Sequence, residues 1–141
     1  MKVNGSCHCG EVTFTADVDP SRVMTCHCTD CQVLSGTPFR TIVAVPIGKF
    51  HMNGSPKTYI KIAQSGNRRA QVFCPNCGSP IYAGDPDDPK VVMLRVGCIE
   101  QRAQLKPSSQ IWMHSAMPWL DELADVPGSP DQKAFLPPLS D

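Results

Sequence analysis

The segment Phe73-Cys74-Pro75-Asn76-Cys77-Gly78 is a Cys-x-x-Cys knuckle, and Gly5-Ser6-Cys7-His8-Cys9-Gly10 supplies a second cysteine pair much earlier in the chain. A structural zinc ion takes four soft ligands in a tetrahedron, and two cysteine pairs can supply them. Such a site contributes folding free energy, because it ties together ligands that are distant in sequence. The sequence therefore predicts a structural zinc site that staples the fold. Its ligands are Cys7, Cys9, Cys74 and Cys77.

A third group of cysteines lies in Cys26-His27-Cys28-Thr29-Asp30-Cys31. Three thiolates within six residues fit one ion, and a three-ligand site leaves the fourth position for water or substrate, as in catalytic zinc sites. The sequence predicts a second, catalytic zinc here. Its ligands, which are also the candidate catalytic residues, are Cys26, Cys28 and Cys31. Two alternatives stay open: Cys7 and Cys9 could share an ion with the first two cysteines of this triplet, and a histidine could close the site.

The eighth cysteine, Cys98, follows an apolar stretch and has no partner at ligand spacing. We interpret it as a buried packing thiol, since free cysteine behaves as a small hydrophobic residue.

Length and charge favour a single cytosolic domain without nucleic-acid or membrane partners. The chain has 141 residues and a formal net charge of +0, which gives no electrostatic case for nucleic acid or anionic lipid. It has neither an N-terminal apolar run of signal-peptide length nor a stretch near the ~20 apolar residues of a membrane span. In the reducing cytoplasm, clustered cysteines favour metal binding over disulfides, and tight Cys-x-Cys spacing also disfavours disulfides.

The apolar residues fall mostly in short alternating runs separated by Gly, Pro, Asn and Asp clusters, which predicts strands joined by turns. The predicted strands are 12–16, 41–45, 58–62, 70–73 and 91–96. Two short helices are predicted, one over 29–34 with Thr29 as its cap and one over 118–123. Because strands follow one another without alternating helices, we predict a mainly β, antiparallel domain over 1–124. A Pro-rich tail follows over 125–141.

The ordered set of cysteine groups resembles that of the glutathione-dependent formaldehyde-activating enzyme (GFA) family. The resemblance covers about residues 3–123. It is carried by residues 5–14, 26–31, 35–39 and 73–82, and ends near Ile111-Trp112 and Pro118-Trp119. It implies a β-tent fold of small antiparallel sheets and the same division of ligands between two zinc ions. The chain departs from the common family pattern at Gln32, where a basic residue is frequent.

The resemblance also implies a reaction. The family joins glutathione and formaldehyde into S-(hydroxymethyl)glutathione, formally a carbon–sulfur lyase acting in reverse, so the expected partner is a small-molecule thiol such as glutathione. A thiol at the open metal position would lose its proton, and its sulfur could attack the aldehyde carbon. A general acid would then protonate the developing alkoxide.

The sequence offers several candidates for the proton donor and for the groups that bind substrate. His27 is adjacent to two ligands, but alternation in an extended segment points it away from them, as it does His8. His51 and His114 have no motif context. Cations near the triplet would suit the carboxylates of glutathione. The candidates by residue type are Arg40, Arg68 and Arg69, with Phe39, Phe73 and Trp112 as possible pocket aromatics.

Two other functions fit the same cysteines. The chain could be a zinc-stabilised binding module without catalysis, with its second site closed by another ligand. It could also be a thiol or redox sensor whose triplet oxidises and releases metal. The fourth ligand of the second zinc discriminates between them, because water or a small thiol favours an enzyme and a protein side chain favours a module.

Overall fold

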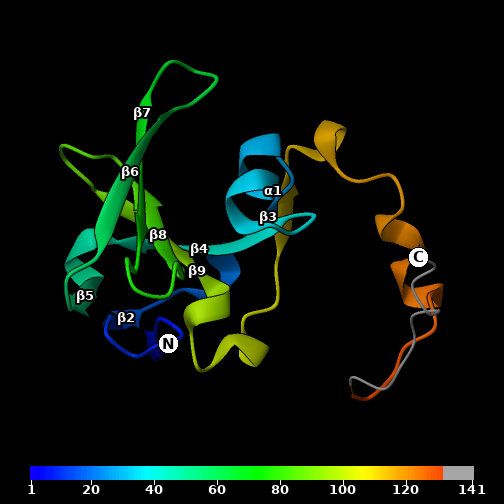
Figure 1. Ribbon diagram of the computed structural model, residues 1–141, viewed down its shortest axis with the longest axis horizontal. Coiled ribbons are helices and arrows are strands. Elements are labelled where there is room, and N and C mark those ends of the chain that lie inside the picture. The colour runs from blue at the N-terminus through cyan, green and yellow to red at the C-terminus, as the bar shows by residue number, and fades with distance from the viewer. Residues whose placement is uncertain (132–141) are drawn as a thin grey trace, which may run out of the picture.

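The computed structural model describes residues 1–131, and it is mainly β, with two sheets and few short helices (Figure 1). The smaller sheet has the order β1-β2-β5, and the larger has the order β10-β3-β4-β9-β8-β7-β6. The strands of the smaller sheet are β1 (Lys2–Ser6), β2 (Thr13–Asp17) and β5 (Phe50–Asn53). Those of the larger sheet are β3 (Val23–Cys26), β4 (Arg40–Pro46), β6 (Lys57–Ile62), β7 (Arg68–Phe73), β8 (Pro80–Gly84), β9 (Val91–Arg95) and β10 (Ser109–Ile111).

The predicted antiparallel class is correct for every strand pair except one. β10 pairs with β3 in parallel, at the edge of the larger sheet. The five predicted strands correspond to β2, β4, β6, β7 and β9. The other five strands were not predicted, because they are short or carry polar, Gly and Cys residues that hide the alternation of a strand. One example is β1, whose sequence is Lys-Val-Asn-Gly-Ser.

The hydrophobic core lies between the two sheets. In the smaller sheet, the rings of Phe14 and Phe50 have centroids 5.8 Å apart. Phe50 also reaches Tyr82 of the larger sheet, with the two centroids 5.3 Å apart. On the same face of the larger sheet, Val43 lies opposite Leu94, and both side chains are fully buried. One face of the larger sheet is therefore covered by the smaller sheet, and its other face is left for a site.

Gly5 lies where the smaller sheet meets the segment that follows β9. It forms an isolated antiparallel bridge with Ile99, and an added Cβ would overlap the Cys98 carbonyl oxygen and the Phe14 ring. Gly5→Ala is expected to lower the free energy of unfolding by about 1–3 kcal/mol, the usual cost of overpacking. Urea unfolding would measure this loss. Gly48→Ala is the matched control, because its added Cβ meets nothing within 4 Å, and equal stability of the two variants would contradict the prediction.

The helix α1 (Thr29–Ser35) corresponds to the first predicted helix, but its predicted cap is wrong. Cys28, not Thr29, is the N-cap residue, because Cys28 has extended backbone angles and its Sγ accepts a hydrogen bond from the Cys31 amide at 3.3 Å. The second predicted helix is displaced and is a 3₁₀ helix over Leu120–Asp125.

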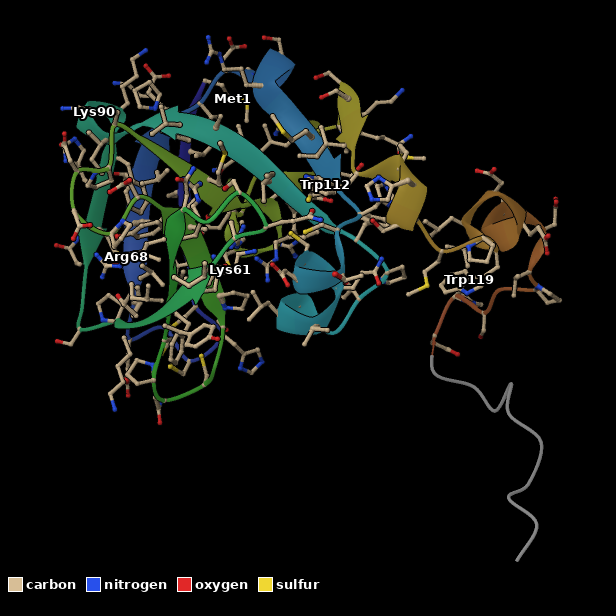
Figure 2. All side chains as sticks on the ribbon, turned by 90° about the horizontal axis from the view of Figure 1, so that it is seen from above. Met1, Lys61, Arg68, Lys90, Trp112 and Trp119 are labelled. Carbon is tan, nitrogen blue, oxygen red and sulfur yellow. The ribbon has the colours of Figure 1, made fainter. Side chains whose placement is uncertain are left out.

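The chain that follows the 3₁₀ helix Met113–Ser115 extends away from the sheets, as both views show, and Figure 2 labels Trp119 on it. The proposed division of the chain at residue 124 falls within this segment. Residues 132–141, which include Pro137 and Pro138 of the predicted tail, lie outside the described part of the chain. Among residues 1–131, no helix is both long enough and apolar enough to cross a membrane.

Candidate metal centres

The structure brings together Cys7, Cys9, Cys74 and Cys77, the set that the two cysteine pairs predict. Their four Sγ atoms lie within 4.8 Å of one another. Cys7 Sγ is 3.5 Å from Cys9 Sγ, and Cys9 Sγ is 3.7 Å from Cys74 Sγ. A tetrahedron with zinc–sulfur bonds of about 2.3 Å has sulfur atoms roughly 3.8 Å apart. The donor set and its spacing therefore fit a zinc ion.

Each cysteine pair is shaped by a turn that ends in glycine. Gly10 and Gly78 have φ angles of 84° and 74°, a region that side-chain-bearing residues rarely adopt. The Gly78 amide donates to the Cys74 carbonyl at 2.9 Å, and the Val12 amide donates to Cys7 Sγ at 3.2 Å. The Val12 amide is thus placed to stabilise a thiolate at Cys7, as backbone amides do in zinc sites.

Two polar contacts hold the cysteine pairs against each other. The His8 amide donates to Ser79 Oγ at 3.0 Å, and Asn76 Nδ2 donates to Glu11 Oε1 at 3.0 Å. Ser79 also contacts Cys77 Sγ at 3.2 Å. Hydrogen bonds from Ser79 lower the pKa of Cys77 to about 5, so this sulfur is a thiolate near neutral pH.

The second cluster contains Cys26, Cys28 and Cys31, which lie at the end of β3, at the cap of α1 and in its first turn. Their Sγ atoms also lie within 4.8 Å of one another, and within residues 1–131 the group has these three members. Hydrogen bonding to Cys31 lowers the pKa of Cys26 to about 5 and raises the pKa of Cys31. The shared hydrogen bond therefore favours a thiolate at Cys26, which suits a cation.

The alternative in which Cys7 and Cys9 share an ion with Cys26 and Cys28 is wrong, because the structure places these pairs in separate clusters. Cys98 belongs to neither cluster. It packs against the core, its Sγ donates to the Pro80 carbonyl at 3.1 Å, and burial raises its pKa.

The second cluster opens into a cleft of about 860 Å³. The cleft lies on the face of the larger sheet that is turned away from the core, since alternation along β3, β4 and β9 separates its lining residues from the core residues. Helix α1 and the segment after β10 form one wall, and β6 with the following turn forms the other. The sheet residues that line it are Met24, Cys26, Arg40, Ile42, Lys61, Ile62, Arg69, Gln71, Ala83, Met93, Arg95 and Ile111.

Two buried guanidinium groups, those of Arg40 and Arg95, line this cleft, and both donate to Gln71 Oε1, at 3.2 and 2.9 Å. Burial, and then the charge of Arg40, lower the pKa of Arg95 to about 9. Of the arginines predicted by type, Arg40 and Arg69 line the cleft, whereas Arg68 is exposed and pairs with Asp87 at 2.9 Å. Sequence reasoning missed Arg95. The sequence does contain a signal for Arg95, which is a charged residue directly after the apolar run 91–94. Charged residues are rarely buried without a role, so a charge in a buried strand indicates a functional site.

The rim of the cleft carries an ion pair and an aromatic group. Lys61 of β6 pairs with Asp30 of α1, so the pair joins the two walls, and Figure 2 shows Lys61 on the side of the sheet that faces α1. Trp112 has a φ angle of 61°, unusual for a bulky residue, and its ring lies 5.4 Å from that of His114. Both rings line the cleft.

The other predicted aromatic residues and histidines lie elsewhere. Phe73 lines a smaller cavity of about 210 Å³ that shares Arg40, Gln71 and Arg95 with the cleft. Phe39 packs on His27 with ring centroids 5.3 Å apart. His27 is buried outside the cleft and its Nε2 lies 3.0 Å from Gln110 Oε1, so it points away from the metal ligands as alternation predicts. His8 and His51 are exposed and also lie outside the cleft.

Gln32, where the family pattern often has a basic residue, has a clear structural contact. Its amide nitrogen donates to the carbonyls of His27 and Ser115, both at 2.8 Å. The side chain thus joins α1 to the segment after β10, and it is not among the residues that line the cleft. A role for position 32 in binding a substrate carboxylate does not follow from this geometry.

Comparisons with known proteins agree with the cysteine pattern. A model of the family "glutathione-dependent formaldehyde-activating enzyme" matches residues 2–115. An uncharacterised lyase of Schizosaccharomyces pombe is 24% identical over 78 residues, which cover 55% of this chain and 54% of that protein, so the chain spans about half the length of this relative. A crystal structure of a Rhodobacter sphaeroides protein has a similar fold, with a TM-score of 0.58 and 16% identity over 76% of this chain and 98% of that chain.

Proposed function

Because the chain belongs to the glutathione-dependent formaldehyde-activating enzyme family, we propose that it is a zinc-dependent enzyme that joins a thiol to an aldehyde. In formal terms this is a carbon–sulfur lyase reaction in reverse, with glutathione and formaldehyde as the proposed substrates. One observation carries the proposal: the three-cysteine cluster opens into a large cleft lined by cations, whereas the four cysteines of the other cluster do not line it.

The two clusters would have different roles. Cys7, Cys9, Cys74 and Cys77 offer four ligands, which is the full set of a structural zinc. The cluster at the start of α1 offers three, which leaves one coordination position for a substrate. Cys26, Cys28 and Cys31 would hold a zinc ion, which would deprotonate and position the incoming thiol.

The chain's own residues would complete the reaction. As the thiol sulfur bonds to the aldehyde carbon, the carbonyl electron pair moves to oxygen, which needs a proton. All four histidines lie within residues 1–131, and among them His114 lines the cleft, so His114 is our candidate donor. The proton that the thiol loses balances the one that the oxygen gains, and no oxidant is required.

We also propose that the protein acts in a reducing compartment such as the cytoplasm. All eight cysteines are free, and both clusters need thiolates for metal binding. The proposed partner is a small-molecule thiol, and the balanced net charge gives no electrostatic case for nucleic acid.

The test is an assay with protein that holds two equivalents of zinc. Formaldehyde and glutathione are mixed, and exchange NMR measures the rate of adduct formation. We expect a rate about 100-fold or more above the spontaneous one, the contribution typical of a positioned proton donor. Cys98→Ser is the control and should match the unmodified chain, because Cys98 lies in neither cluster.

Other outcomes of the assay point to the other functions. If the adduct forms only at the spontaneous rate while both zinc ions are bound, the proposed activity is wrong and a binding module is favoured. A spontaneous rate combined with zinc release on mild peroxide treatment would favour a redox sensor instead.

A further inference from the structure

The floor of the cleft holds two positive charges that are almost entirely removed from water. Arg40 is 6% exposed and Arg95 is 5% exposed. They lie on the neighbouring strands β4 and β9, and Arg40 lies directly opposite the metal-ligand candidate Cys26 of β3. A buried charge is costly unless it is paired, so this arrangement needs a partner.

The described part of the chain does not supply enough acceptors for these groups. A guanidinium offers five N–H donors, yet both arginines share one neutral acceptor, Gln71 Oε1. The Nε atoms of Arg40 and Arg95 are buried and have no hydrogen-bond partner. Within residues 1–131, no salt bridge joins either arginine to a carboxylate, and Asp30, which lines the same cleft, pairs with Lys61.

A zinc ion bound by Cys26, Cys28 and Cys31, here called the metal–thiolate centre, would balance only part of the positive charge of the two arginines. Three thiolates around one divalent zinc carry a net charge of −1, which a single guanidinium would balance. Two buried guanidinium groups line the cleft here, and Arg69 lines it as well. The excess positive charge and the unpaired Nε atoms suit a planar group with two anionic oxygens, since arginine binds carboxylates through paired hydrogen bonds.

We propose that Arg40 and Arg95, held in place by Gln71, bind a carboxylate of the substrate, so that the cleft selects thiols that carry a carboxylate over neutral thiols. The carboxylate site follows from the cleft itself, while its assignment to a thiol substrate rests on the proposed function. Gln71 has the role of a positioning residue, because it contacts both arginines and fixes the spacing between them.

The experiment measures binding without turnover. The probes are S-methylglutathione, which has free carboxylates but no thiol, and its diethyl ester, in which both carboxylates are masked. The zinc-loaded protein is titrated with each probe, and ¹⁵N NMR follows the arginine Nε–H signals. We expect S-methylglutathione to shift the signals of Arg40 and Arg95, because a carboxylate beside the guanidinium groups changes the surroundings of their Nε–H groups. The diethyl ester should leave these signals unchanged.

Variants test which arginines are responsible. Arg95→Gln is expected to weaken S-methylglutathione binding by about 10- to 100-fold, the usual loss for a hydrogen bond to a charged group. Arg95→Lys keeps the charge without the planar fork and should fall between that variant and the unmodified chain. Arg68→Gln is the matched control and should bind normally, because Arg68 pairs with Asp87 outside the cleft.

Three results would overturn the inference. The diethyl ester could bind as well as the free acid, or Arg95→Gln could bind normally. The Arg95→Gln protein could also lose zinc while its preference for the free acid persists, which would assign the arginines to the metal–thiolate centre. The measurement is separate from catalysis: carboxylate binding without faster adduct formation would support the site and contradict only the proposed reaction.

Discussion

Replacing Cys74 with serine is expected to unfold the domain and remove the zinc of the four-cysteine cluster. Cys74 is fully buried, and its cluster joins the turn after β1 to the turn after β7. Structural zinc binds with an apparent free energy of ~10–16 kcal/mol, which matches or exceeds the ~5–15 kcal/mol stability of a whole domain. Far-UV circular dichroism and a zinc count measure the result, which should be loss of the β signal and at most one zinc per chain.

The control for this experiment is Cys98→Ser. Cys98 is also packed against the core, but it belongs to neither cluster, and a serine can still donate to the Pro80 carbonyl. This variant should keep its fold and both zinc ions. A folded Cys74→Ser protein with two bound zinc ions would contradict the structural role of the cluster.

Replacing Cys26 with serine is expected to abolish the reaction while the fold remains. Its cluster is formed by residues 26–31 alone, so loss of this metal does not separate distant segments. The variant should hold one zinc per chain, show unchanged circular dichroism and form the glutathione–formaldehyde adduct only at the spontaneous rate. That is a loss of about 100-fold or more.

Cys28→Ser separates metal binding from helix capping. Cys28 caps α1 through its Sγ, and serine is a preferred N-cap residue, so the helix should persist in this variant. We expect the same loss of one zinc and of activity as in Cys26→Ser. Full activity in either variant, with a zinc count of two, would exclude a catalytic role for the cluster.

The compact group of Cys26, Cys28 and Cys31 was predictable from the sequence, whereas spacing left open which cysteines lie beside Cys7 and Cys9. A tetrahedral ion accepts only a few spacings, and three sulfurs in six residues must lie close together whatever the rest of the chain does. The predicted strands were those with clear alternation, such as the run 41–45 in β4. Short local sequence patterns were sufficient to predict the cysteine triplet and these strands.

The floor of the cleft was not predictable in the same way. Arg40, Gln71 and Arg95 come from β4, β7 and β9, and only the register of the sheet brings them to one place. The parallel pairing of β10 with β3 depends on a long connection after β9, for which the local sequence carries no signal. The N-cap of α1 is Cys28, whose sulfur accepts a hydrogen bond from the Cys31 amide. N-cap propensity favours threonine over cysteine, so the sequence predicted Thr29 instead.

The larger sheet has a consequence for how this protein can change during evolution. Residues that alternate toward the smaller sheet, such as Val43 and Leu94, are constrained by packing, and their neighbours Ile42 and Arg95 face the cleft. A mutation on the cleft side can therefore alter what is bound without opening a void in the interior. Descendants of one ancestor can therefore acquire different ligand preferences while the scaffold that carries the two cysteine clusters persists.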